Sequence, residues 1–274
     1  MLEKDAQGRP AHGGRHFLAF PAGKNCILVD GTIPIEPGRV RWIRFLTSHP
    51  KDLSPDLVSV MAAEPRLCRH VHLPVQSGSD RVLAAMHRGY SAGGFLRLVD
   101  AIRGALTGVA ITTDILTGFP GETEEDVRLT LALMERVGFD EAFTYRYNPR
   151  EGTAAALLGD PVAEHEKLER LDRIIAAQRR ITARRAAERL RRVTEVLVEG
   201  VSKRNPEELL ARTEWDAMVV LPGNPSLIGR FVRVRLEVRR LIAAPVLAVV
   251  GRSQVVKPTA PPCSGGLGRL PTGG

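Results

Sequence analysis

The sequence predicts an α/β protein in which a partial parallel βα barrel is followed by a small all-β barrel. Between residues 40 and 160, apolar stretches typical of strands alternate with amphipathic stretches typical of helices. This alternation indicates parallel βα units. After a long helix, the chain changes to short β-like stretches separated by Gly, Pro and Asn. Such a pattern is typical of a small antiparallel barrel.

Four strands are expected in the first region. Val40–Leu46 is the first, and Val71–Val75 is the second. Pro74 weakens the second strand, because proline has no N–H to donate to a neighbouring strand. Val109–Leu116 and Ala142–Tyr147 are the third and fourth.

The helices between these strands are predicted from their starts. Ser54 precedes a proline and an aspartate, a combination that favours the first turn of a helix. A short helix is expected near 80–87, and Ser91 predicts the start of another. Thr123 and Asp126 resemble a capping box, which predicts a fourth helix.

The second half of the chain begins with one long amphipathic helix. Its end, Arg179–Arg192, holds seven arginines and one acid. Three strands are then expected at Val193–Val198, Ala217–Leu221 and Phe231–Val238, and Leu241–Val250 is a candidate for another. The predicted organisation is an irregular, unassigned segment 1–39, a barrel region 40–160, a basic linker helix 161–192, a small β barrel 193–251 and a disordered Gly- and Pro-rich tail 252–274.

The composition bounds the function. The 274 residues carry a net charge of +8, with a pI near 9.9, which favours a polyanionic partner such as RNA. Aromatic residues make up 5% of the chain, too few for an extensive base-stacking surface. The chain has no long apolar run and no signal-peptide pattern, so a cytoplasmic protein without a membrane partner is expected.

Candidate ligand-binding residues follow the strands, because βα barrels bind ligands at the carboxyl ends of their strands. All four ends are polar or rich in Gly and Pro, which suits a nucleotide or a carboxylate. The alternative is that they are ordinary loop residues. The four ends are Thr47–His49, Gln76–Ser79, Thr117–Glu122 and Asn148–Thr153.

Two polar features lie inside the predicted strands. His70 and His72 share one strand face. No third ligand stands at metal spacing, so packing or hydrogen bonding at the barrel wall is expected and no metal site is predicted. Asp114 interrupts an apolar strand, and burying it alone would be costly. A pairing with Arg146 and a role in holding a ligand are equally open.

The arginine-rich segment also has two interpretations. A charge run on a helix is most often a solvated face. Here it adjoins a small β barrel, which makes contact with RNA phosphates an equal alternative.

Several motifs together resemble the MiaB-type methylthiotransferases. The resemblance runs from about residue 40 to 250, with the motifs in order at natural spacing. The motifs are Ser48–Asp52, His72–Ser79, Met86–Tyr90, Asp114–Thr123 and Pro149–Thr153, and the segments Val198–Lys203 and Ala211–Thr213 are similar to the TRAM domain of that family.

The resemblance implies a radical S-adenosylmethionine (SAM) enzyme, carrying 4Fe–4S clusters, that methylthiolates isopentenyl-adenosine beside the tRNA anticodon. It implies a partial radical SAM barrel, a TRAM-like RNA-binding domain and tRNA as partner. No catalytic residue is assigned. The residues expected on the SAM side of the barrel are Gln76, Ser77, Asp114, Gly118, Glu122 and Arg146. Those expected to contact RNA are Arg184, Arg185, Arg191, Arg192, Lys203 and Arg212.

The cysteines depart from the family pattern. Cys26, Cys68 and Cys263 are the three in the chain, and they cannot form the Cys-x-x-x-Cys-x-x-Cys loop that holds a cluster. We therefore expect a product of a truncated, split or mis-started gene, inactive alone, with a separate N-terminal chain as one source of the cluster domains.

Three alternative functions stay open. The first is a non-catalytic RNA-binding protein. The second is a relative within the family that acts on threonylcarbamoyl-adenosine tRNA or on a ribosomal protein. The least favoured is a metabolic βα-barrel enzyme that binds a phosphate at Gly118–Thr123.

Overall fold

The computed structural model describes residues 40–44, 49–159 and 162–237. The expectations for 1–39, for Leu241–Val250 and for the tail 252–274 lie outside the described residues, as does the end of the predicted strand Val40–Leu46. The described part of that strand makes a single parallel bridge, between Ile43 and Leu67.

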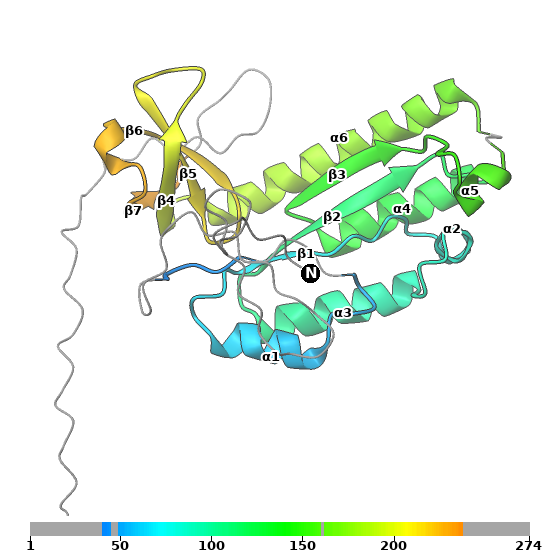
Figure 1. Ribbon diagram of the computed structural model, residues 1–274, viewed down its shortest axis with the longest axis horizontal. Coiled ribbons are helices and arrows are strands. Elements are labelled where there is room, and N and C mark those ends of the chain that lie inside the picture. The colour runs from blue at the N-terminus through cyan, green and yellow to red at the C-terminus, as the bar shows by residue number, and fades with distance from the viewer. Residues whose placement is uncertain (1–39, 45–48, 160–161, 238–274) are drawn as a thin grey trace, which may run out of the picture.

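The first domain contains a parallel sheet with strand order β1-β2-β3 (Figure 1). The strands are β1 (His70–His72), β2 (Ala110–Thr117) and β3 (Glu141–Arg146). The prediction of parallel βα units is confirmed. β1 is shorter than expected and ends before Pro74, because proline cannot donate to a ladder. Pairing resumes in one bridge between Gln76 and Ile115.

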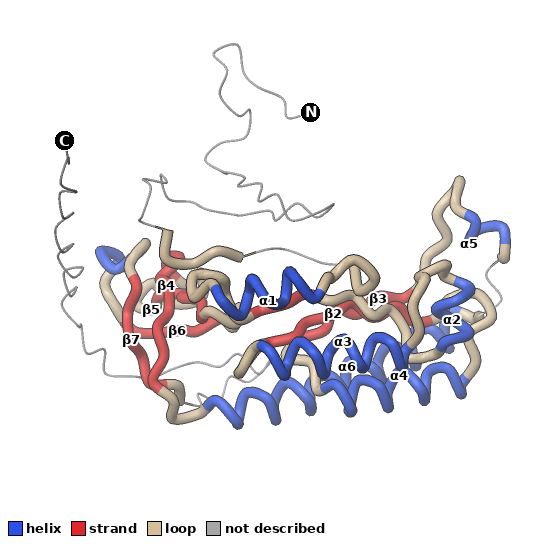
Figure 2. Tube along the Cα trace, turned by 90° about the horizontal axis from the view of Figure 1, so that it is seen from below, coloured by secondary structure: helices blue, strands red, loops and turns tan. Residues whose placement is uncertain are grey.

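Helices cover one face of this sheet. Figure 2 shows α3, α4 and α6 side by side along it. The helices are α1 (Pro55–Ala63), α2 (Asp80–Ala85), α3 (Ala92–Ala105), α4 (Glu124–Val137), α5 (Ala154–Leu157) and α6 (Glu164–Arg189).

Three of the helix starts are confirmed in atomic detail. The Ser54 side chain accepts a hydrogen bond from Leu57 N, and Ser91 accepts one from Gly94 N. The capping box of α4 is complete, with both reciprocal bonds between Thr123 and Asp126 present. Helix α5 was not predicted. Helix α6 ends at Arg189 rather than Arg192.

The two faces of the sheet differ sharply. Val71, Ile111 and Ile115 point into an apolar core beneath the helices. Side chains two residues apart along a strand share a face, so His72 and Asp114 lie on the opposite one. On that face the β3 side chains Phe143 and Tyr145 are about half exposed, at 47% and 51%.

The second domain is an antiparallel sheet with its own apolar core and strand order β6-β5-β4-β7. It follows the prediction, with one addition. Strand β5 was not predicted, although its burial alternates strictly along the strand. The elements are β4 (Val193–Val201), β5 (Glu208–Thr213), β6 (Met218–Pro222), the 3-10 turn η1 (Pro225–Leu227) and β7 (Phe231–Arg235).

The segment 40–44 ties the second domain to the first. Arg41 bonds Glu195 on β4 at 2.7 Å. The Trp42 ring meets Phe231 of β7 edge-on, with centroids 4.8 Å apart. Arg44 donates to Asp216 at 3.3 Å and to the Thr213 carbonyl. No helix in the described ranges combines the length and apolar character needed to cross a membrane.

Candidate strand-end site and basic surface

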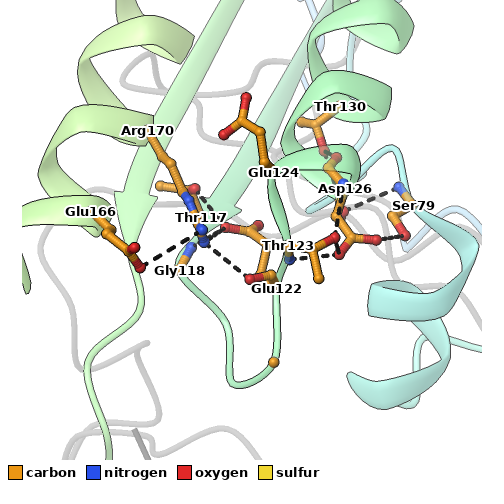
Figure 3. Close-up of polar contacts among 12 residues, drawn as sticks. Ser79, Thr117, Gly118, Glu122, Thr123, Glu124, Asp126, Thr130, Glu166 and Arg170 are labelled. Carbon is orange, nitrogen blue, oxygen red and sulfur yellow. Dashed lines mark hydrogen bonds and ion pairs between the residues drawn. The ribbon is translucent and has the colours of Figure 1, made fainter. Parts of the chain in front are cut away.

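The loops after β1 and β2 are joined by the start of helix α4 (Figure 3). The Asp126 carboxylate accepts hydrogen bonds from Ser79 Oγ at 2.6 Å and from Thr123 N and Oγ1 at 2.7 Å each. Arg81 donates to the same carboxylate. Burial alone would raise the pKa of Asp126, but these donors outweigh it and hold the pKa well below its usual range.

The loop 76–79 lies directly on α4. A Cβ atom on Gly78 would stand 2.5 Å from the Leu129 carbonyl oxygen and 2.6 Å from Thr130 Cα. Gly78 N donates to Thr130 Oγ1 at 2.9 Å, and Ser77 Oγ lies 3.3 Å from the same hydroxyl. Only glycine fits at this position, and the Ser77 side chain is committed to the helix.

The loop 118–122 is closed in the same way. One oxygen of Glu122 accepts from Gly118 N at 2.7 Å, from Thr117 Oγ1 at 3.0 Å and from Arg170 at 3.3 Å. Burial raises the pKa of Glu122 against the pull of these donors. Gly118 has φ +75°, and the aliphatic part of Lys167 lies where its Cβ would be. We call the Glu122 contacts, the contacts of the loop 76–79 with α4 and the Asp126 contacts together the strand-end network.

The open face of the sheet carries a histidine pair. His70 Nε2 and His72 Nδ1 each lie 2.9 Å from Thr112 Oγ1, and His72 Nε2 lies 3.5 Å from Asp114 Oδ1. One hydroxyl can donate once, so at least one of the two imidazoles donates its N–H to Thr112 Oγ1. Burial lowers the pKa of His70 to about 4. The prediction that both histidines hydrogen-bond at the barrel wall is confirmed.

The predicted Asp114–Arg146 pairing is wrong, and the strand register explains why. Arg146 stands beside Thr117, while Asp114 stands beside Phe143. An offset of three residues places the two side chains on opposite faces of the sheet. Arg146 instead pairs with Glu164 of α6 at 2.5 Å.

The six residues predicted on the SAM side of the barrel therefore lie in three different surroundings. Gln76 N donates to the Asp114 carbonyl at 2.8 Å, so these two are neighbours. Ser77, Gly118 and Glu122 belong to the strand-end network, and Arg146 turns toward α6. Their contact with SAM stays a prediction.

The cysteine in the described residues does not suit an iron–sulfur cluster. Cys68 is 3% exposed within the core, and burial raises the pKa of its thiol to about 11. A cluster ligand has to be a thiolate. In the part of the chain that the structure describes, no three His, Cys, Asp or Glu residues form a group that could hold a metal ion.

Half of the predicted RNA contacts are engaged within the protein. Arg184 pairs with Glu135 at 3.2 Å, Arg185 with Glu188 at 2.8 Å, and Arg212 with Glu199 at 2.6 Å. The other three, Arg191, Arg192 and Lys203, are exposed. Arg191 adopts φ +63°, a left-handed conformation that turns the chain from α6 into β4.

Helix α6 holds two site residues that sequence reasoning missed. Arg170 bonds Glu122, and Lys167 is 1% exposed. The neighbouring leucine, Leu168, is 46% exposed. The helix is rotated so that Lys167, Ile174 and Ile181 face the core. These three buried residues stand seven positions apart, so the sequence does contain the pattern of the buried face. A lysine in such a series usually indicates a solvent-exposed face, and the pattern was therefore missed.

Two comparisons with known families identify the domains. Residues 24–134 match the Radical SAM superfamily, and residues 188–238 match the TRAM domain. Among solved structures, coproporphyrinogen III oxidase from Escherichia coli aligns with a TM-score of 0.44 and 14% identity, over 71% of this chain and 46% of that chain. This likeness is too distant to identify a function.

Curated relatives are much more similar. The tRNA-2-methylthio-N(6)-dimethylallyladenosine synthases of Treponema pallidum and Treponema denticola are 50% and 47% identical to this chain, over 73% and 72% of it. The synthase of Methylacidiphilum infernorum is 47% identical over 72%. The chain spans 42–44% of the length of these relatives. The chain thus contains radical SAM and TRAM domains and is homologous to the C-terminal part of the tRNA-2-methylthio-N(6)-dimethylallyladenosine synthases.

Proposed function

We propose that this chain binds tRNA and serves as the RNA-binding part of a methylthiotransferase. The family reaction is SAM-dependent methylthiolation of isopentenyl-adenosine next to the anticodon. The observation that supports the proposal most is the TRAM domain at 188–238, which begins with the exposed residues Arg191 and Arg192. A role on tRNA implies that the protein works in the cytoplasm.

The proposal excludes cluster chemistry by this chain alone. Its three cysteines are far apart in sequence, and Cys68 is sealed in the core. A separate chain carrying the cluster domains is one source of that chemistry. Anaerobic reconstitution followed by iron and sulfide analysis tests this point. We expect well below one cluster per chain, and about four irons per chain would contradict the proposal.

The exposed basic residues predict how binding depends on salt. Each phosphate that the protein neutralises contributes about −0.7 to −0.9 to the slope of log affinity against log salt concentration. Arg191, Arg192 and Lys203 are exposed, whereas Arg185 is paired with Asp140 and Glu188. The informative variant therefore changes the first three and leaves Arg185 in place.

The experiment is a salt titration of tRNA binding by the full chain. The variant R191Q/R192Q/K203Q should bind at least about 10-fold more weakly at low salt, with a slope flatter by about 2. The control R97Q/R128Q/R136Q removes the same charge from exposed positions on α3 and α4 and should keep the slope. Equal losses for both variants would show that only net charge matters.

The second candidate function is RNA binding without any catalytic role. The observation that favours it is the strand-end network, which engages Ser77, Gly118 and Glu122 within the protein. Equilibrium dialysis of SAM against the full chain separates the two candidates. Binding that is lost in the variant D114N would support the methylthiotransferase reading, and no binding would favour the RNA-binding protein.

A further inference from the structure

A cavity lies where the parallel sheet meets the TRAM domain. Its volume is about 610 Å³, and its walls come from β3, from α6 and from the turn between β5 and β6. Thr112 and Glu141 place it near the amino ends of β2 and β3, away from the strand-end network. Figure 1 shows the end of α6 reaching this junction.

Two polar atoms on residues of the cavity walls lack hydrogen-bond partners. They are Gln178 Oε1 and Trp215 Nε1, whereas Arg185 Nε, also on a lining residue, lies 3.4 Å from Asp140 Oδ1. Gln178 is 6% exposed. Its Nε2 donates to the Phe139 carbonyl at 3.0 Å and to Thr182 Oγ1 at 2.9 Å. These two bonds fix the amide orientation, so Oε1 is the atom left unpaired.

Unpaired buried polar atoms are rare in folded proteins because each costs free energy. Two beside one cavity point to a ligand that completes them. The ligand must accept a hydrogen bond from the indole N–H and donate one to the amide oxygen. A nucleobase edge has this mixed character, with ring nitrogens or carbonyls as acceptors and N–H groups as donors.

The remaining walls suit the rest of a nucleotide. Phe143 and Trp215 supply aromatic surface, and Arg179 is an exposed arginine at the cavity. Arg189 lies over the Trp215 ring at 5.1 Å and bonds Asp140 at 2.7 Å, which holds the tryptophan side of the cavity in place. A volume of about 610 Å³ falls within the range of small-ligand sites.

We propose that this cavity binds one unpaired nucleotide of the tRNA. The inference rests on the proposed function and adds a specific contact to it. The base enters the cavity and pairs with Gln178 and Trp215, and its phosphate stays at the rim beside Arg179. Unpaired nucleotides are the usual targets of base-specific RNA recognition, because their edges are accessible.

The first test uses the two tryptophans of the chain as a matched pair. Trp215→Phe removes the unpaired N–H and keeps an aromatic ring. Trp42→Phe makes the same change in the ring that packs on Phe231, outside the cavity walls. We expect tRNA binding about 5-fold weaker for Trp215→Phe and unchanged for Trp42→Phe. Equal binding by both variants would overturn the inference.

The second test fills the cavity. Ala186 lines it, and its neighbour Ala187 is exposed on α6. Ala186→Leu should weaken tRNA binding at least about 10-fold, whereas Ala187→Leu should not. Ultraviolet crosslinking of bound tRNA should also map to Trp215 or Phe143 in the wild-type chain.

The two proposals fail in different ways. If wild type does not bind tRNA, the proposed function is wrong. If wild type binds, and the R191Q/R192Q/K203Q variant weakens binding while Ala186→Leu and Trp215→Phe do not, the cavity holds only water and the nucleotide inference is wrong.

Discussion

The strand-end network and the junction cavity contain the same kinds of residue but differ in how their polar atoms are paired. Asp126 and Glu122 each accept several hydrogen bonds at the strand ends. At the junction, polar atoms of Gln178 and Trp215 are buried without partners. The comparison teaches that buried polar residues in family motifs can serve the fold, whereas the unpaired atoms at the junction are left for a bound partner or water to complete.

The largest loss of stability is expected when Gly78 in the strand-end network is replaced. Gly78→Ala places a methyl group 2.5 Å from the Leu129 carbonyl, so α4 has to move away from the loop. We expect a loss of at least about 3 kcal/mol in the free energy of unfolding, measured by chemical denaturation. Gly104→Ala in α3 is the control. A Cβ there has no atom within 4 Å, so about 0.5–1 kcal/mol of stabilisation is expected. If both alanines were equally tolerated, the loop would not be packed as described.

The second largest loss of stability is expected when the Asp126 carboxylate is removed. Asp126→Ala leaves Ser79, Thr123 and Arg81 without their shared acceptor, and we expect a loss of about 3 kcal/mol in unfolding free energy. Glu125→Ala is the matched neighbour, because Glu125 is exposed and pairs only along the helix with Arg128. Its expected loss is below about 0.5 kcal/mol. Similar losses at the two positions would remove the distinction between the network and a surface pair.

The same carboxylate predicts a pH dependence. The pKa of Asp126 is lowered in the folded state, so its contribution to stability is present above the unfolded pKa, which is near 4. That contribution is lost as the pH falls below this value. The stability gap between wild type and Asp126→Asn should therefore be widest near neutral pH and narrow between about pH 5 and pH 2. Denaturation curves at several pH values measure it, and a gap independent of pH would contradict the prediction.

The smallest change in unfolding free energy is expected at the junction, where the substitution should stabilise the protein rather than destabilise it. Trp215→Phe removes a buried N–H that has no partner, so stability without RNA should be unchanged or increased by up to about 1 kcal/mol. Thermal unfolding of the RNA-free chain tests this. A loss above about 1 kcal/mol would mean that the indole N–H already has a partner, and the contrast with Asp126 would no longer hold.

Local sequence signals predicted much of the fold. Thr123 and Asp126 lie three residues apart and predicted the capping box of α4, which depends only on neighbouring residues. The alternation of strands and helices predicted the parallel sheet, because each strand and helix is also recognised from a short, continuous stretch of sequence. Strand β5 was missed, although Leu209, Ala211 and Thr213 alternate with less buried neighbours, because a six-residue stretch with Glu and Arg is a weak strand signal.

The site was harder to predict, because its partners are distant in sequence. The partner of Asp114 depends on the register between β2 and β3, which no local pattern specifies. For the arginine-rich segment of α6, the sequence left a solvated face and contact with RNA as equal alternatives. In the structure, Glu135 and Asp140 neutralise Arg184, Arg185 and Arg189. The cavity is equally hard to predict from the sequence, since its walls come from four separated segments.

The contact between Arg44 and Asp216 has a consequence for how the protein is made. It joins residues 172 positions apart, whereas the pairs β4–β5 and β5–β6 join neighbouring segments. During synthesis the ribosome releases residue 44 many seconds before residue 216, at roughly 5–20 residues per second. The βα units can form in that interval, but strands β6 and β7 cannot, because both follow residue 216 in the chain. Docking of the two domains, and with it the completed junction cavity, is therefore a late event that follows the folding of the βα units.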